Sequence, residues 1–331
     1  MSTTILFVLA GLVLLVLGGD LLVRGAVKAA TRLGVSPLVI GLTLVGFGTS
    51  TPELVTSVQA SLAGAPGIAI GNIVGSNIAN ILLILGIAAL IAPIAVQARA
   101  LRRDGAVALA VAVAFAALAF VWPLDRVVGA VFVAGLALYI WTAFRQETSA
   151  APATAGHGAL YDKALATEGV DDALAPDTAE RGGSLLWPLL LALAGLVLVV
   201  AGGWLLVEGA TELARAFGIS ETVIGLTVVA VGTSLPELVT SVVAALRRQA
   251  DVAFGNIIGS NIYNVLGIGG VTGLVAPVTI PTEIATFDLP VMVGVTALML
   301  VFAYTARKIA RWEGAVLLAG YGVYLWFLWP A

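Results

Sequence analysis

The chain has 331 residues, of which 60% are hydrophobic and only 11% are charged, and its mean hydropathy is +1.08. Soluble globular proteins carry about 25% charged residues, so the composition excludes that class and indicates an integral membrane protein. A net charge of −3, no cysteine and one histidine, His157, exclude a nucleic-acid-binding surface, a disulfide framework, thiol catalysis and zinc sites built from thiolates or several histidines.

An apolar helix needs about 20 residues to cross a hydrocarbon core about 30 Å thick. The sequence therefore predicts an all-α membrane protein with ten transmembrane helices, at 4–22, 37–62, 67–93, 105–123, 127–144, 185–206, 221–246, 252–277, 286–305 and 312–329. We expect the first segment to be a retained helix rather than a signal peptide, because no positive residues precede it and no small-residue cleavage site follows. Trp122, Trp187, Trp312, Trp326 and Trp329 lie near helix ends and fit an aromatic belt.

Residues 146–184 differ from the apolar segments around them. They divide the chain into five predicted helices in 1–145 and five in 185–331. We expect a solvated, disordered linker rather than a folded domain, since the segment is short and polar and has no EF-hand spacing. Its acidic residues are Glu147, Asp162, Glu168, Asp171, Asp172, Asp177 and Glu180.

Positive residues predict the orientation, because cytoplasmic loops are enriched in Lys and Arg. With the N-terminus outside, the outer side holds only Arg126 and Arg215. Both termini are thus expected outside and the linker in the cytosol, with the protein in a prokaryotic inner membrane. The inner set is Arg24, Lys28, Arg32, Arg99, Arg102, Arg103, Arg145, Lys163, Arg181, Arg247, Arg248, Arg307, Lys308 and Arg311.

The sequence also repeats itself. With Gly18 placed over Gly202, it matches itself without a gap from Gly18 to Pro93: VIGLTLVGFGTSTPELVTSV (39–58) lies over VIGLTVVAVGTSLPELVTSV (223–242), and IGNIVGSNIANIL (70–82) over FGNIIGSNIYNVL (254–266). Because five helices is an odd number, the second copy is expected upside down in the membrane. Inverted repeats are typical of secondary transporters, whose substrate site lies near the midplane where the repeats meet.

The motif GTSxPEL places Glu53 and Glu237 near the middle of otherwise uncharged helices. A carboxylate at that depth is costly and normally has a functional partner, although a protonated carboxyl joining two helices is the structural alternative. Pro52 and Pro236 lack an N–H and are expected to open the helix locally, leaving carbonyls as candidate ligands. Carboxylate, hydroxyl and carbonyl oxygens suit hard cations such as Ca²⁺, Na⁺ or Mg²⁺. The neighbouring candidates are the hydroxyls of Thr49, Ser50, Thr233 and Ser234 and the carbonyls of Gly46, Thr49, Ala230 and Thr233.

The second motif, GNIxGSNIxN, follows in each repeat. At helical spacing Asn72, Ser76 and Asn80 share one face, as do Asn256, Ser260 and Asn264. Gly71 and Gly75, with Gly255 and Gly259, form small-residue pairs that let another helix approach. The asparagines could also serve only to join helices, which is an open alternative for Asn72, Asn77 and their counterparts. For Ser76, Asn80, Ser260 and Asn264 we favour ion binding.

The two motifs and the ten-helix pattern resemble the calcium/cation antiporter superfamily, and most closely the sodium/calcium exchanger family. The resemblance implies a diamond-shaped cluster of cation sites between the second, third, seventh and eighth helices, with the long first and sixth helices sliding to alternate access. It implies these ligands: Gly46, Thr49, Ser50, Glu53, Ser76, Asn80, Ala230, Thr233, Ser234, Glu237, Ser260 and Asn264.

One position departs from the family pattern. Many sodium/calcium exchangers resembling this chain have aspartate where Asn264 stands, so the fixed charge of the cluster is about −2, from Glu53 and Glu237 alone. One Ca²⁺ or two monovalent cations would balance that charge. The hypothesis that follows is nearly electroneutral exchange, with proton coupling left open.

The function predicted from the sequence is a secondary antiporter that exchanges Ca²⁺ for Na⁺, with no cofactor and with a monomer sufficient. The alternative is a Ca²⁺/H⁺ antiporter in which the same two glutamates take up protons. A passive channel is disfavoured because channels usually assemble around an axis along the membrane normal, and an intramembrane enzyme because the surrounding hydroxyls would have no role. Asp20 and Glu208 are interpreted as interfacial or gate-associated, since they do not occupy equivalent repeat positions.

Overall fold

The computed structural model describes residues 2–150, 184–216 and 230–328, and most of that part is helical. Helices are expected because a backbone in lipid must satisfy its own hydrogen bonds. The first part contains α1 (Ser2–Leu33), α2 (Pro37–Ile40), η1 (Gly41–Val45), α3 (Gly46–Thr49), α4 (Thr51–Leu62), α5 (Pro66–Ala79), η2 (Asn80–Leu85), α6 (Gly86–Ile91), β1 (Ile94–Ala95), α7 (Ala98–Ala100), η3 (Leu101–Gly105), α8 (Ala106–Ala119) and α9 (Arg126–Ala150), where η marks a π-helical stretch. The second contains α11 (Leu186–Ala216), α13 (Ala230–Thr233), α14 (Leu235–Leu246), α15 (Ala250–Tyr263), η6 (Asn264–Gly269), α16 (Gly270–Val275), η7 (Ile284–Asp288), α17 (Leu289–Ala306), β2 (Lys308–Ile309) and α18 (Arg311–Leu328).

Six of the described helical segments are long and apolar enough to span a bilayer, or seven if the bent pair Pro37–Thr49 and Thr51–Leu62 is one span. Described helices occur in each of the ten expected ranges, while the count of ten membrane crossings stays a prediction. The expected segment 221–246 lies partly outside the described residues, as does most of the linker 146–184. α9 continues through the first residues of that expected linker to Ala150.

α1 is the clearest correction to the expected boundaries. It ends at Leu33 rather than near residue 22, so Asp20 lies well inside the helix, and Arg24, Lys28 and Arg32 are on it rather than in a loop. Charged residues do not stop a helix whose end projects beyond the hydrocarbon, and Lys and Arg are good helix formers. The stop is Gly34, whose left-handed backbone (φ +67) follows the last turn.

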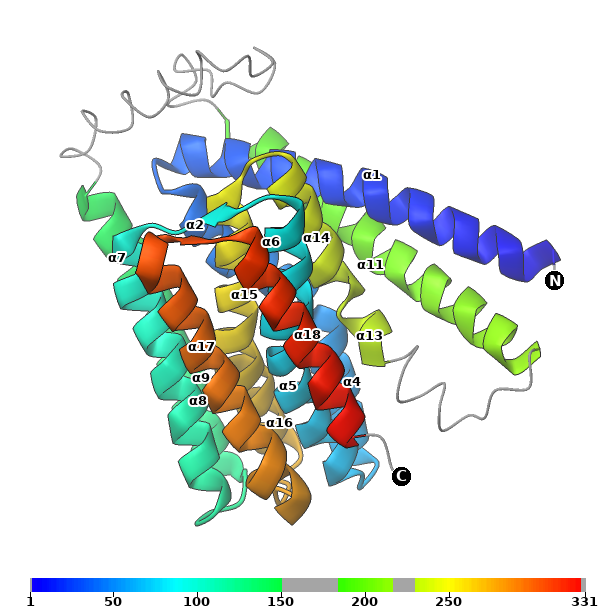
Figure 1. Ribbon diagram of the computed structural model, residues 1–331, viewed down its shortest axis with the longest axis vertical. Coiled ribbons are helices and arrows are strands. Elements are labelled where there is room, and N and C mark those ends of the chain that lie inside the picture. The colour runs from blue at the N-terminus through cyan, green and yellow to red at the C-terminus, as the bar shows by residue number, and fades with distance from the viewer. Residues whose placement is uncertain (1, 151–183, 217–229, 329–331) are drawn as a thin grey trace.

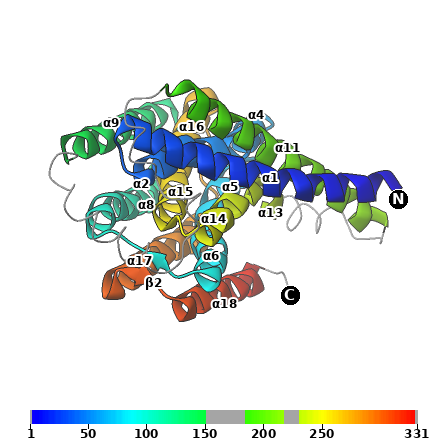
Figure 2. The ribbon, with the colours of Figure 1, turned by 90° about the horizontal axis from the view of Figure 1, so that it is seen from above.

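α1 and α11 pack along each other in opposite directions, and Figures 1 and 2 show them side by side, crossing obliquely over the other helices. Their contact is lined by regularly spaced glycines. A Cβ atom on Gly11 would lie 2.8 Å from the carbonyl oxygen of Gly202, and one on Gly18 would lie 2.8 Å from that of Gly195. In the sequence repeat, Gly11, Gly18 and Gly25 align with Gly195, Gly202 and Gly209, so equivalent helices of the two repeats meet antiparallel, as an inverted repeat requires.

The centre of the molecule is formed by α5–α6 and α15–α16. In the most apolar window of these spans, 72% and 83% of residues are buried, against 28% for α1, α9, α11 and α17. Figure 2 shows α5 and α15 in the middle of the bundle, with α8, α9, α17 and α18 around them. Polar side chains on α5 and α15 are therefore shielded from lipid.

The structure repeats both within the segment that matches in sequence and beyond it. The π-helical stretches Asn80–Leu85 and Asn264–Gly269 occupy equivalent positions in the two repeats, and each begins at an asparagine. Further on, Tyr139 donates a hydrogen bond to Asp104 (3.1 Å) and Tyr324 donates one to Asp288 (2.7 Å). Asp104 and Asp288 again align between the repeats, although Arg103 also pairs with Asp104 whereas Phe287 stands before Asp288.

The loops of the described residues gather at two opposite ends of the bundle. At one end β1 pairs antiparallel with β2, Gln97 donates a hydrogen bond to Asp251, and Arg32 donates one to the carbonyl of Ser184. At the other, Leu124 forms a bridge with Val278, and Ser61 donates to the carbonyl of Ala276 (2.6 Å). The first end contains the predicted inner loops and the second the predicted outer ones.

Candidate cation-binding site

Both GTSxPEL segments contain a helix break immediately before the glutamate. Ser50 separates α3 from α4 with φ −83° and ψ 9°, and Ser234 separates α13 from α14 with φ −91° and ψ 7°. Pro52 and Pro236 follow in the first turn of the new helix, where a missing N–H costs nothing. The first break bends the helix by 45°. The predicted opening is therefore present, and it places Glu53 and Glu237 in the first turn of α4 and α14.

The two glutamates are joined crosswise to the opposite repeat. Ser50 Oγ donates a 2.7 Å hydrogen bond to Oε1 of Glu237, and Ser234 Oγ donates a 3.1 Å hydrogen bond to Oε1 of Glu53. Glu53 is 1% exposed and Glu237 is 2% exposed. The two carboxylates thus lie close together in the buried centre, each completed by a hydroxyl from the other half of the chain.

An equivalent pair of contacts in the two repeats also holds each glutamate's helix in place. Asn72 Nδ2 donates to the carbonyl of Glu53 (3.0 Å) and to Ser57 Oγ (2.8 Å). Asn256 Nδ2 donates to the carbonyl of Glu237 (3.3 Å) and to Ser241 Oγ (2.9 Å). Asn72 and Asn256 therefore join neighbouring helices, which is the alternative role considered for them.

Several buried polar atoms at the centre have no hydrogen-bond partner within the described residues. They include the second oxygen, Oε2, of both Glu53 and Glu237. Leaving such groups unpaired in a dry interior is costly, so a cluster of them indicates a place for a charged ligand. The other unpaired atoms on η2, α14, α15, η6 and α16 are Asn80 Oδ1, Ser260 Oγ, Asn261 Nδ2, both amide atoms of Asn264, Thr240 Oγ1 and Thr272 Oγ1.

The asparagines at the starts of the two π-helical stretches belong to the same region. Asn80 Nδ2 donates to Asn261 Oδ1 (3.1 Å), which leaves Asn80 Oδ1 available, and Asn264 is fully buried. π-helical stretches are rare and occur often at functional sites, because they displace backbone groups from regular pairing. Ser76 is buried on α5 one turn before Asn80.

The remaining predicted ligands are placed less directly. Thr49 is buried, and its hydroxyl contacts the carbonyls of Val45 (3.0 Å) and Gly46 (3.3 Å) and Oδ1 of Asn256 (3.3 Å). The carbonyl of Gly46 also accepts from the N–H of Ser50 (3.1 Å). Ala230 and Thr233 begin and end the short helix α13.

These groups form an all-oxygen environment with two carboxylates. Within the described ranges, no group of three or more His, Cys, Asp or Glu side chains could hold a metal. Hydroxyl, amide and carbonyl oxygens must then supply any remaining ligands, a set that suits hard cations. Sequence reasoning did not single out Thr240 or Thr272, and it considered Asn261 only as the counterpart of Asn77 in the repeated GSNI motif.

Comparison with known proteins places the chain in a family. The model of the sodium/calcium exchanger protein family matches residues 3–145 and 187–329. The chain is 38% identical to the putative antiporter CaxA of Alkalimonas amylolytica over 100% of both chains, and 37% identical to the sodium/calcium exchanger MaX1 of Methanosarcina acetivorans over 98% of both. The solved structure of the sodium-calcium exchanger NCX_Mj, from a crystal soaked with Na⁺ and no Ca²⁺, superimposes with a TM-score of 0.81 at 33% identity, covering 98% of each chain. The chain belongs to the sodium/calcium exchanger family of the calcium/cation antiporter superfamily.

Proposed function

We propose that this cation antiporter exchanges Ca²⁺ for Na⁺ through the site between α4, α5, α14 and α15. The crosswise pairing of Ser50 with Glu237 and Ser234 with Glu53 carries the proposal, because it joins two carboxylates from opposite repeats at the buried centre. Their second oxygens have no partner within the described residues and are suited to a cation. MaX1 and NCX_Mj are named as sodium/calcium exchangers, which supports sodium and calcium as the ions.

The charge of the site supports the exchange of two Na⁺ for one Ca²⁺. Glu53 and Glu237 contribute a fixed charge of about −2, and the amides of Asn80 and Asn264 contribute oxygen ligands but no charge. One Ca²⁺ or two Na⁺ would neutralise the site, so the same oxygens would hold either load in turn. The twelve predicted ligands, Gly46 and Ala230 included, remain our proposed set.

Alternating access would use movement of α1 and α11 together against the core of the bundle. Their glycine-lined contact brings the two backbones close together, so the pair is suited to move as one body against the core formed by α5 and α15. Both half-sites come from one chain, so a monomer is sufficient. In the proposed orientation the protein lies in a prokaryotic inner membrane, with both termini outside and the linker between the two five-helix repeats in the cytosol.

The test is ⁴⁵Ca²⁺ uptake into proteoliposomes loaded with Na⁺, with K⁺-loaded and acid-loaded vesicles in parallel. We expect uptake only against internal Na⁺ and its loss in Glu53→Gln. Uptake driven by acid loading would instead establish the Ca²⁺/H⁺ alternative, with the two glutamates as proton carriers. Downhill ⁴⁵Ca²⁺ leakage without any counter-ion would contradict exchange altogether.

A further inference from the structure

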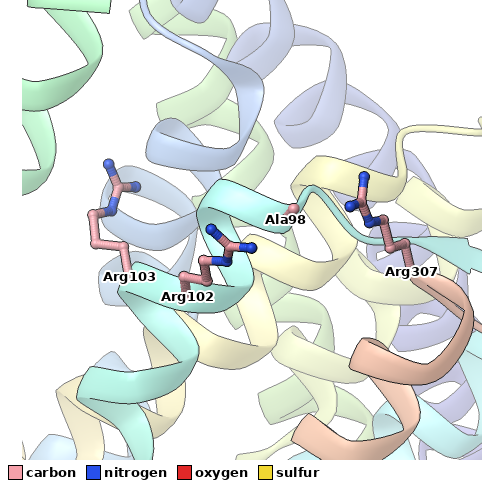
Figure 3. A pocket seen from close by; sticks show the side chains of 4 residues that line it. All are labelled: Ala98, Arg102, Arg103 and Arg307. Carbon is pink, nitrogen blue, oxygen red and sulfur yellow. The ribbon is translucent and has the colours of Figure 1, made fainter.

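A second polar feature lies far from the buried carboxylates, at the end of the bundle where β1 pairs with β2. It is an open pocket of about 600 Å³ lined by Ala98, Arg102, Arg103 and Arg307, here named the basic pocket. Figure 3 shows the three arginine side chains on the same side of the helix ends, with Ala98 between Arg102 and Arg307.

The pocket is built from two segments that are far apart in the sequence, one from each repeat. The β1–β2 pairing places Ile94 against Ile309 and Ala95 against Lys308, and Val96 N–H donates a 2.8 Å hydrogen bond to the carbonyl of Arg307. Arg307 caps α17 with a left-handed backbone (φ 51), a conformation uncommon for non-glycine residues. These contacts hold Arg307 close to Arg102 and Arg103, against the repulsion of like charges.

The positive charge of the pocket is only partly balanced. Arg103 pairs with the buried Asp104 at 2.7 Å. By contrast, the guanidinium groups of Arg102 and Arg307 make no ion pair or hydrogen bond with any side chain in the described residues. The residues that line the pocket are Ala98 and the three arginines, so the lining itself includes no carboxylate. Two unbalanced guanidinium groups therefore face the pocket.

Apolar helix surface continues from the pocket into the membrane-spanning region. Arg102, Ala106, Ala110 and Val113 are exposed and recur on one face of the continuous helix formed by α7, η3 and α8. On α17, which contacts α8, Val301 and Tyr304 are 56% and 73% exposed below Arg307. A phosphate group at the arginines with hydrocarbon along these faces matches a phospholipid, and basic pockets between helices at the membrane surface bind anionic headgroups.

We propose that the basic pocket binds the phosphate of an anionic phospholipid such as phosphatidylglycerol. Arg102 and Arg307 contact the phosphate, and the acyl chains lie on the exposed faces of α8 and α17. This inference is independent of the ion that the antiporter carries.

The test compares the full chain with R102Q/R307Q in nanodiscs of equimolar phosphatidylglycerol and phosphatidylcholine. Lipids that stay with the protein on detergent extraction are then counted by native mass spectrometry. We expect the full chain to retain phosphatidylglycerol preferentially, and the double variant to lose that preference by about tenfold or more. The matched control is Arg248→Gln, an exposed arginine with the same left-handed backbone (φ 56), at the same end of the molecule but outside the pocket. Its lipid preference should equal that of the unchanged chain, and unaltered circular dichroism and elution would show that the double variant is folded.

Three results would overturn the proposal. The first is equal phosphatidylglycerol retention by R102Q/R307Q and the unchanged chain. The second is displacement of the lipid by millimolar inorganic phosphate, which would make free phosphate the ligand. The third is phosphatidylglycerol retention that is absent in the unchanged chain and appears only when the acidic residues of 146–184 are replaced by amides, which would make the acidic linker the occupant.

Discussion

The hydroxyl of Ser50 lies 2.7 Å from Oε1 of Glu237, so the first repeat completes the carboxylate of the second. Ser234 Oγ makes the equivalent hydrogen bond to Oε1 of Glu53, at 3.1 Å. Each half of the chain therefore supplies only part of the proposed cation site. Each copy of the motif supplies the serine that bonds the glutamate of the other copy. Both copies are therefore polar although they lie in the centre of an apolar bundle.

The first prediction concerns these serines. Ser50→Ala and Ser234→Ala should each weaken Ca²⁺ binding by about tenfold or more, since a hydrogen bond to a charged group contributes about 1.5–3 kcal/mol. The two variants should have similar effects, because they remove equivalent contacts. Isothermal titration with Ca²⁺ measures both. Thr51→Ala is the matched control: Thr51 is next to Ser50 but exposed, and within the described part of the chain its hydroxyl bonds only to the carbonyl of Phe47 (3.2 Å). A loss of affinity in Thr51→Ala as large as in Ser50→Ala would contradict a specific role for the crosswise contact.

The second prediction concerns the charge of the site. Unchanged protein should carry no net current during exchange, because two Na⁺ or one Ca²⁺ balances the two glutamates. Asn264→Asp adds a carboxylate at the buried centre, where two unit charges about 4 Å apart interact by about 4 kcal/mol at an effective dielectric constant of about 20. We expect tighter Ca²⁺ binding and a current that accompanies exchange.

Solid-supported membrane electrophysiology, with ⁴⁵Ca²⁺ flux on the same vesicles, measures both effects. Asn72→Asp is the control for added charge, because Asn72 joins α5 to α4 rather than facing the ion in our proposal. A steady exchange current in the unchanged protein would refute electroneutral coupling.

Much of the centre could be predicted from the sequence because the relevant signals are local and occur twice. A proline before a buried glutamate predicts the break at Ser50, and an exact repeat predicts the same break at Ser234. The crosswise pairing could not be predicted, since it depends on how the repeats dock. The partner of Asn80 shows the same limit: its amide meets Asn261 of the other repeat rather than its own counterpart, Asn264.

The edges of the molecule were less predictable. Charges at Asp20 and Arg24 suggested a helix end, but α1 runs on to Leu33, where Gly34 provides the actual stop. The basic pocket depends on two strands of two residues each, too short to give a hydropathy pattern. In both places the outcome is set by contacts between segments distant in the sequence.

The third prediction concerns the glycine-lined contact of α1 and α11. Gly18→Val should separate the two helices, because even a Cβ atom there would lie 2.7 Å from the backbone nitrogen of Val199 and 2.8 Å from the carbonyl oxygen of Gly195. Overpacking against backbone costs about 1–3 kcal/mol or more, so we expect a lower thermal transition and loss of transport. Gly294→Ala on α17 is the control, since nothing lies within 4 Å of a Cβ atom there. If the two variants have the same thermal transition and the same transport rate, the close approach of α1 and α11 is not required for function.

The fourth prediction concerns Asp20, which connects α1 to the core. Its carboxylate pairs with Arg24 on the same helix at 2.9 Å and with Arg247 at the end of α14. The equivalent positions in the other half hold Trp204 and Ala63, so this tie exists at one end of the molecule only. Movement of α1 against the core would have to break it. Asp20→Asn should therefore change the rate of transport several-fold, while stability changes by no more than about 1 kcal/mol, as is usual for a partly exposed ion pair.

Exchange of the charges separates an effect of the pair from an effect of either residue. D20R/R247D should restore the transport rate towards that of the unchanged protein, whereas each single reversal should alter it more than Asp20→Asn does. Asp20→Asn combined with Arg248→Gln is the comparison for net charge, since Arg248 is exposed and adjacent to Arg247. Rates measured by ⁴⁵Ca²⁺ uptake, with hydrogen exchange along α1 as the structural readout, should follow the pair rather than the total charge. Equal rates in the swapped and singly reversed variants would remove the ion pair from the transport cycle.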